Sequence, residues 1–147
     1  MFPIIHRKNA KDKEGYHWSL LVLDTTDWSW SHYDSLRPRK KNSKSKTLDD
    51  AILFKSRIAS TIKLHKSLTK EEKEMVDGDV NVEPCPQQGN TVNCAIYVCH
   101  YMKSLFVDKT LPHETDKEGA ESVKKLKVDI CCNILKEKAT RRKAGHH

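Results

Sequence analysis

Two neighbouring stretches decide the fold class of this chain: YHWSLLVL at residues 16–23 and WSWSHYD at residues 28–34. The first is short, apolar on both faces and free of Gly and Pro, which predicts a buried β-strand. The second alternates with a period of two, which predicts another strand. Residues 24–27 are polar and typical of a turn. We therefore expect an antiparallel hairpin.

Charged loops and helical patterns follow the hairpin. Residues 37–46 carry six basic residues and no apolar one, so a solvated loop is expected. Thr47, with Asp50 three positions later, resembles a capping box and predicts a helix that runs to about Leu64. The apolar seam of that helix is expected at Leu48, Ile52, Ile58 and Ile62.

The second half of the chain adds three helices and a strand. A capping-box pattern at residues 69–72 predicts a short helix that ends at Gly78, and residues 80–82 predict a brief strand. The mostly apolar run 95–106 predicts a central buried helix, and residues from about 118 to 137 predict an amphipathic helix. Buried positions of the central helix are expected at Ile96, Val98, Cys99 and Met102. The seam of the last helix is expected at Val123, Leu126, Ile130 and Ile134.

Length and composition set the class of protein. With 147 residues, a net charge of +7 and a pI near 9.1, the sequence predicts one domain. We place it at residues 1–137, followed by a disordered basic tail at 138–147. No apolar run approaches the roughly 20 residues needed to cross a bilayer. Five cysteines without a secretory signal indicate reduced thiols and a location in the cytoplasm or nucleus. No CxxC pair is present, so no metal is expected. We also expect no cofactor. The chain is expected to be a monomer.

The hairpin brings together a possible acid–base pair. If Asp24 and Asp27 close a two-residue turn, His17 lies directly opposite Asp34, and an imidazole beside a carboxylate suits a general base. An ordinary polar cross-strand pair is the alternative, and geometry alone favours it.

A thiol at a helix N-terminus adds a candidate nucleophile. Cys94 lies between the polar loop 86–93 and the central helix, where the helix dipole favours a thiolate and Asn93 is a suitable N-cap. The alternative is that Cys94 only fills space in the core. We assign three other cysteines to packing: Cys99, Cys131 and Cys132.

These motifs, taken together, resemble the Ulp1-type cysteine proteases that process ubiquitin-like proteins. The resemblance rests on His17-Trp18, on residues 33–35 (Tyr-Asp-Ser), on residues 86–88 (Pro-Gln-Gln) with Asn90, and on Cys94. The strings HWSLLV at 17–22 and HYDS at 32–35 are closest to the branch that acts on NEDD8, followed by the branch that acts on SUMO. Residues 2–4 look like the strand that precedes the catalytic His. The implied fold is papain-like α+β, truncated at its N-terminus.

The resemblance implies a role for each motif residue. Cys94 would be the nucleophile and His17 the general base, with Asp34 orienting the imidazole. Gln88 would donate to the oxyanion, together with the backbone N–H of Cys94. Trp18 would form a wall of the narrow tunnel that admits the Gly-Gly tail of the modifier. The implied partners are NEDD8 or SUMO and their lysine conjugates.

Three departures from the family keep a second hypothesis open. Asn93 stands where the family has Asp, Ala95 stands where it has Gly, and the N-terminal part of the family's domain is missing. A catalytically weak or inactive homologue that only binds a ubiquitin-like modifier is therefore the alternative. A third hypothesis, nucleic-acid binding through the basic loop 37–46, is disfavoured because the loop has no aromatic residue to stack on bases.

Overall fold

The computed structural model describes residues 1–7, 16–36, 45–89, 93–109 and 117–144. Its centre is a four-stranded sheet in the order β1-β2-β3-β4. The strands are β1 (Phe2–Arg7), β2 (Tyr16–Leu23), β3 (Trp30–Tyr33) and β4 (Val80–Val82). β1, β2 and β3 pair antiparallel, and β4 adds to β3 in parallel. The predicted strands at 16–23 and 80–82 are confirmed.

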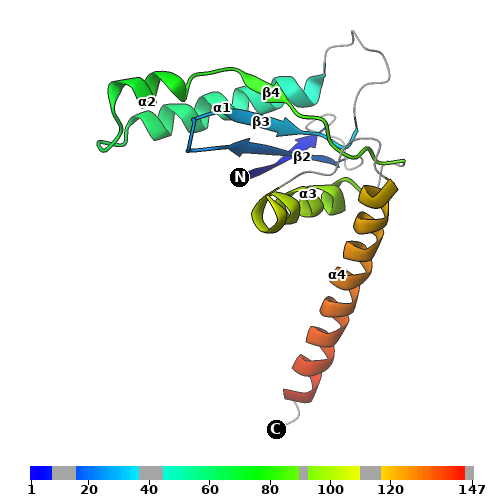
Figure 1. Cartoon of the computed structure of the whole chain (residues 1–147). Helices are drawn as coiled ribbons and strands as arrows, with labels where there is room; N and C mark the ends of the chain where they lie inside the picture. Colours follow the sequence, from blue (N-terminus) through cyan, green and yellow to red (C-terminus); the bar gives the residue numbers. More distant parts are fainter. Residues whose placement is uncertain (8–15, 37–44, 90–92, 110–116, 145–147) are drawn as a thin grey trace.

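Helices cover both faces of this sheet (Figure 1). They are α1 (Lys46–Lys63), α2 (Lys70–Met75), α3 (Cys94–Lys103), the π-helical turn η1 (Ser104–Asp108) and α4 (Lys117–Ala144). α1 and α2 lie on one side of the sheet and α3 on the other, while α4 packs against α3 and extends away from the body. The arrangement is mixed α+β, as predicted.

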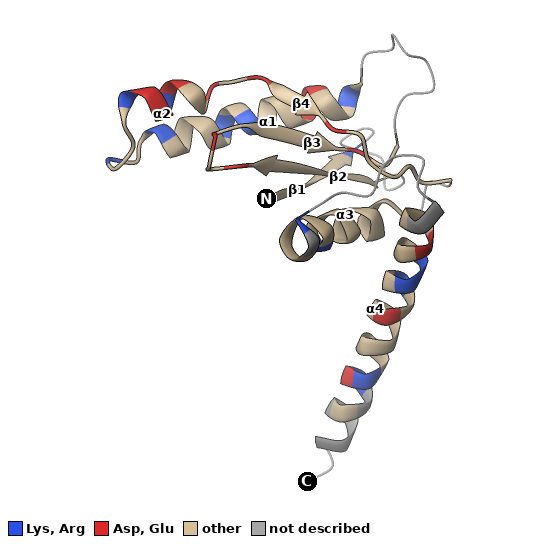
Figure 2. Cartoon of the chain, in the orientation of Figure 1, with Lys and Arg blue, Asp and Glu red and all other residues tan. Residues whose placement is uncertain are grey.

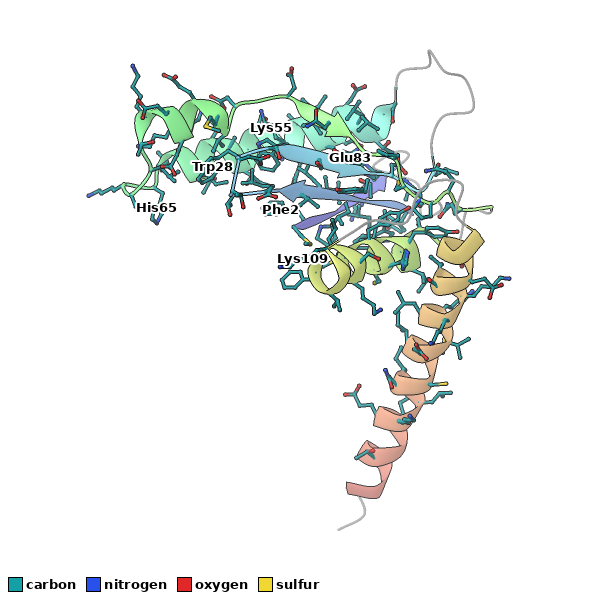
Figure 3. All side chains as sticks on the ribbon, in the orientation of Figure 1. Phe2, Trp28, Lys55, His65, Glu83 and Lys109 are labelled. Carbon is teal, nitrogen blue, oxygen red and sulfur yellow. The ribbon has the colours of Figure 1, made fainter. Side chains whose placement is uncertain are left out.

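Two apolar clusters hold the layers together, one on each face of the sheet. This separation follows from the alternation of side chains along β2, where Leu20 and Leu21 point to opposite faces. The α3-side cluster is Leu20, Tyr33, Cys85, Tyr97, Val98, Tyr101 and Val123. The α1-side cluster is Ile4, Leu21, Trp30, Ala51, Ala59 and Val76. Figure 3 shows the side chains that fill both spaces, and Figure 2 shows that the charged residues gather on α1, α2 and α4.

The hairpin connection is longer than predicted, and the predicted register is wrong. β3 begins only at Trp30, and Leu20 pairs with Tyr33. Continued by one step, that register sets Asp34 opposite Ser19 rather than His17. Asp24 and Asp27 each accept a hydrogen bond from a backbone N–H two residues on. Trp28 adopts a φ of 58°. These local bonds stabilise a wider turn than the two-residue turn we assumed.

The N-cap of α1 lies two residues before the predicted one. Ser45 is its N-cap, and its side chain accepts from the N–H of Leu48, so Thr47 is not the cap. The buried face consists of Ala51, Lys55 and Ala59, with Ile58 and Ile62 half-buried. Ile52, predicted in the seam, is exposed.

The capping box of α2 is present as predicted. Thr69 accepts from the N–H of Glu72, and the Glu72 carboxylate accepts from the N–H of Thr69. Both bonds are local, so the pattern needs no tertiary contact to form.

The predictions for the last two helices are correct in part. Val98 is buried and Ile96 and Met102 pack against the α3-side cluster, but Cys99 is exposed. Cys131 and Cys132 are exposed as well, so the assignment of these three thiols to packing is wrong. α4 continues through residues 138–144, beyond the predicted end at 137.

Of the predicted seam of α4, only Val123 is buried. α4 meets only the end of the body, so the rest of its length has no packing partner among the described residues (Figure 1). No helix in the described part of the chain is long and apolar enough to cross a membrane. The basic residues 37–44 lie outside the described residues.

Candidate active site

The predicted acid–base pair is formed. His17 is the second residue of β2, Asp34 directly follows β3, and His17 Nε2 lies 2.6 Å from Asp34 Oδ1. The predicted hydrogen bond is confirmed, whereas Asp34 lies just beyond the end of its predicted strand. Because the register sets Asp34 opposite Ser19, the contact is diagonal across the ladder, a separation that a long side chain spans.

Asp34 is held by a residue that the sequence analysis missed. Thr47 Oγ1 donates to Asp34 Oδ2 at 2.6 Å, and the N–H of Leu36 donates to Oδ1 at 2.9 Å. Burial would raise the pKa of the Asp34 carboxyl, but hydrogen bonds from His17, Thr47 and Leu36 outweigh burial and lower it. Asp34 is therefore an oriented carboxylate. The signal was a Thr in the first turn of α1, which we interpreted only as a cap.

A buried hydrogen-bonded chain lies beside the pair. His32 Nε2 lies 2.9 Å from Ser19 Oγ, which lies 2.7 Å from His6 Nε2. His6 Nδ1 in turn lies 2.9 Å from the Asp50 carboxylate. The His6 ring stacks on the His17 ring, with centroids 5.8 Å apart. Burial lowers the pKa of His32 to about 4, so this imidazole is neutral near pH 7. This hydrogen-bonded chain contacts the His17 ring through His6.

Cys94 is the first residue of α3 and is buried. Its Sγ donates to the backbone oxygen of Tyr16 at 3.9 Å, so the thiol lies against the residue that precedes His17. Asn93 occupies the N-cap position, but its side chain makes no cap bond and instead accepts from Lys127 Nζ at 3.3 Å. The predicted N-cap position of Asn93 is therefore confirmed, but its side chain does not cap the helix. The direct approach of the Cys94 sulfur to the His17 ring stays a prediction.

Gln88 is buried and has one side-chain donor unused. Ser35 Oγ donates to its Oε1 at 3.1 Å, and the Gln88 N–H donates to the Ser35 carbonyl at 2.9 Å. Gln88 Nε2 is buried and meets no acceptor among the described residues. A buried unpaired amide is rare and points to a ligand or reacting group that would accept from it. Sequence analysis missed Ser35, whose only signal was its place beside Asp34.

The segment that carries Gln88 is fastened on both sides. Gln87 Nε2 donates to the carbonyls of Asp34 and Cys85, each at 3.0 Å. The hydroxyl of the fully buried Tyr101, on α3, donates to the Pro86 carbonyl at 2.6 Å. The acid–base pair and the segment around Gln88 are thus joined through the backbone at Asp34.

Trp18 follows His17 in β2 and points to the opposite face of the sheet. It is half-buried and packs against the α3-side cluster. That Trp18 forms a wall of the tunnel for the Gly-Gly tail stays a prediction. Asn90 lies outside the described residues.

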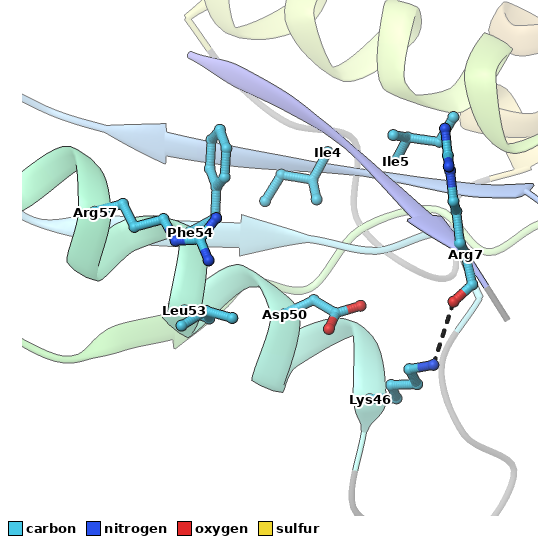
Figure 4. A pocket seen from close by; sticks show the side chains of 8 residues that line it. All are labelled: Ile4, Ile5, Arg7, Lys46, Asp50, Leu53, Phe54 and Arg57. Carbon is cyan, nitrogen blue, oxygen red and sulfur yellow. Dashed lines mark hydrogen bonds between the residues drawn. The ribbon is translucent and has the colours of Figure 1, made fainter. Parts of the chain in front are cut away.

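A hollow of about 360 Å³ lies between β1 and α1, away from the predicted site residues (Figure 4). It is lined by Ile4, Ile5, Arg7, Lys46, Asp50, Leu53, Phe54 and Arg57. Asp50 links it to His6. The side chains of His17, Asp34, Gln88 and Cys94 do not line this hollow. In the described part of the chain, no group of three His, Cys, Asp or Glu side chains could hold a metal ion.

These residue types suit attack by a thiol on an acyl carbon. An imidazole oriented by a carboxylate can take up a proton, a thiol at a helix N-terminus can act as nucleophile, and an amide donor can stabilise an oxyanion. The sequence model of the Ulp1 protease family, C-terminal catalytic domain, matches residues 2–136. This chain belongs to the Ulp1 protease family. It is therefore a homologue of cysteine peptidases.

Solved structures of the SUMO protease Ulp1 are similar to this Ulp1-family chain. One, with its catalytic cysteine oxidised to a sulfinic acid, is 25% identical, with a TM-score of 0.46 over 71% of this chain and 42% of that one. Another, in the sulfenic acid form, is 21% identical, with a TM-score of 0.52 over 82% of this chain and 47% of that one. The chain thus spans less than half the length of these Ulp1 chains, and the second likeness supports the fold. None of the curated proteins compared with the chain gives a match.

Proposed function

We propose that this chain is a thiol isopeptidase that cleaves after the C-terminal Gly-Gly of a ubiquitin-like modifier joined to a lysine. NEDD8 is the first expected modifier and SUMO the second. The observation that carries the proposal is the His17–Asp34 hydrogen bond of 2.6 Å with the Cys94 thiol against Tyr16, the neighbour of His17. Packing alone gives no reason for these polar groups to gather from such distant positions.

In the proposed first step His17 takes the proton of the Cys94 thiol. The sulfur forms a bond to the carbonyl carbon of the terminal Gly, and the π electron pair moves to oxygen. When the carbonyl re-forms, the C–N bond breaks and the lysine nitrogen takes the proton from His17, which leaves a thioester. Asp34 stabilises the imidazolium in between, and its lowered pKa keeps it ionised.

Water completes the proposed cycle. His17 takes a proton from water as its oxygen attacks the thioester carbon, and collapse of the second tetrahedral intermediate breaks the S–C bond. The proton then returns to the sulfur of Cys94. Gln88 Nε2, buried and without an acceptor among the described residues, would donate to the oxyanion in both steps. The backbone N–H of Cys94 would be the second donor.

Choice of modifier rests on resemblance alone. The strings at residues 17–22 and 32–35 favour NEDD8, and the similar solved structures are of a SUMO protease. Trp18, placed directly after the base, is the residue we expect to contact the Gly-Gly tail.

The fold accommodates both departures around the nucleophile. Ala95 is exposed, so its methyl group does not press on the core. Asn93 is engaged by Lys127 across the α3–α4 contact, so an uncharged residue there has its own partner. Neither observation favours the alternative that the chain only binds a modifier.

Electrophilic probes test the proposal. NEDD8 and SUMO, each with a vinyl sulfone in place of the C-terminal carboxylate, are incubated with wild type, Cys94→Ala and Cys99→Ala. Cys99 is the matched control because it is an exposed thiol on the same helix. We expect an adduct with wild type and Cys99→Ala and none with Cys94→Ala, faster with NEDD8. Binding of either modifier without an adduct would instead support the binding-only homologue.

A further inference from the structure

The residue after Asp34 points to a connection between the two parts of the site. Ser35 is 1% exposed, and its hydroxyl donates to Gln88 Oε1 at 3.1 Å. Its carbonyl accepts from the Gln88 N–H at 2.9 Å. Gln88 is thus held at its backbone and at its side chain by the same residue.

The neighbouring glutamine shows what this arrangement achieves. Gln87 Nε2 is engaged by two carbonyl oxygens, so its amide serves to fasten the segment. In Gln88 the bond to Ser35 takes the oxygen end of the amide. Because the carboxamide is planar, fixing Oε1 also fixes the direction of Nε2, which is the donor left unpaired and buried. A free amide could rotate by half a turn and present its oxygen instead, which would repel an oxyanion.

We propose that Ser35 is a positioning residue that holds the Gln88 amide with its N–H₂ group toward the reacting oxygen. This inference rests on the proposed function, since it assigns an oxyanion-donor role to Gln88. Asp34 orients the base while Ser35 orients the donor, so one dipeptide sets both groups. A single displacement of the chain at 34–35 would disturb both together.

A reversible aldehyde distinguishes this role from simple packing. SUMO or NEDD8 ending in a C-terminal glycine aldehyde accepts the Cys94 sulfur at its carbonyl carbon. The π pair moves to oxygen, which takes the thiol proton and gives a hemithioacetal. Its oxygen occupies the place of the oxyanion, so affinity reports on the donor. Alkylation of Cys94 by iodoacetamide expels iodide without forming an oxyanion, so its rate reports on the thiol alone.

The experiment is a double-mutant cycle of Ser35→Ala, Gln88→Ala and both together. Ser31→Ala is the matched control, because the Ser31 hydroxyl, in β3, likewise donates to the side chain of a residue distant in sequence, Glu83, at 2.9 Å. We expect aldehyde affinity to fall about 100-fold in Gln88→Ala and about tenfold in Ser35→Ala. Ser35→Ala should cost nothing further in the Gln88→Ala background. The alkylation rate at Cys94, located by peptide mapping, should stay within about twofold in all variants, and Ser31→Ala should keep full affinity.

Two results would overturn the inference while leaving the protease intact. One is wild-type affinity in Ser35→Ala, and the other is the same tenfold loss with and without Gln88. A wild-type chain that forms no hemithioacetal with either modifier would instead remove the proposed function, and the role of Ser35 with it. Thermal melts of each variant show whether a loss arises from unfolding.

Discussion

The site has an acid–base half (His17, Asp34 and Thr47) and a nucleophile half (Cys94, Gln88 and Ser35). The two halves differ in whether all of their hydrogen-bonding atoms have partners. Both oxygens of Asp34 have partners within the chain, from β2, from the backbone and from α1. In the other half, the Gln88 amide has its oxygen bound and its Nε2 without a partner among the described residues. One half is complete before any ligand arrives, whereas the other leaves a donor for it. Preorganised charge on one side and an open donor on the other suit a reaction that develops negative charge.

The largest expected effect comes from removing the charge of the acid–base half. Asp34→Asn should lower kcat/KM by about 10³- to 10⁴-fold, because a neutral amide cannot stabilise the imidazolium or select the tautomer. The measurement is steady-state cleavage of a modifier fused to a fluorogenic amide. Asp27→Asn, in the exposed hairpin turn, is the control and should keep wild-type rates. A loss of less than tenfold in Asp34→Asn would contradict the comparison.

Lowering the pH should reduce the free energy of unfolding, because His32 lies in the buried hydrogen-bonded chain beside His17. The pKa of His32 is about 4 in the folded chain and 6.5 for an ordinary His, so the unfolded state binds the proton first. Stability is therefore complete above pH 6.5, falls by about 3 kcal/mol between pH 6.5 and 4, and levels off for this group below that. Below pH 3.8, protonation of Asp34 removes more stability, since its folded pKa is lowered.

Urea unfolding at pH 7, 5.5 and 4 measures this dependence. His32→Gln retains a polar group near Ser19 but takes up no proton, so its stability should change less across the window. Parallel curves for wild type and His32→Gln between pH 6.5 and 4 would show that His32 is not the cause.

A smaller effect is expected from the residue that supports Asp34. Thr47→Val keeps the shape of the side chain but removes its hydrogen bond to Oδ2. We expect kcat to fall about tenfold, roughly 1.4 kcal/mol in the barrier, because Oδ1 still holds His17 and the Leu36 N–H. Thr47→Ser retains the hydroxyl and should recover most of the rate. Equal losses in both variants would mean that Thr47 acts through packing.

An effect of similar size, on stability rather than on rate, concerns the nucleophile half. Tyr101→Phe removes the donor to the buried Pro86 carbonyl and should cost about 1–2 kcal/mol of unfolding free energy. Tyr97→Phe is the matched control on the same helix, because its hydroxyl makes a longer bond of 3.3 Å to Gln87. It should cost less in the same urea titration. The reverse order would show that the segment around Gln88 is fastened elsewhere.

Local patterns predicted the parts of the fold that local bonds stabilise. The bounds of β2 and the capping box of α2 were predictable because their signals lie within a few residues. The register of β3 was not, since it depends on side-chain bonds in the turn. The exposure of Cys99 and Cys131 depends on what each helix packs against, and an apolar pattern does not supply that partner.

The sequence by itself determined the chemical groups and their order along the chain: imidazole, carboxylate, amide and thiol at His17, Asp34, Gln88 and Cys94. Only the tertiary structure decided which residues hold them. Thr47 reaches Asp34 across 13 positions and Ser35 reaches Gln88 across 53. Neither pair has a periodic or capping signal, because each contact forms only when a strand end packs against a separate element. The physical reason is that a hydrogen bond needs its partners within about 3 Å, and for distant residues packing alone provides that distance.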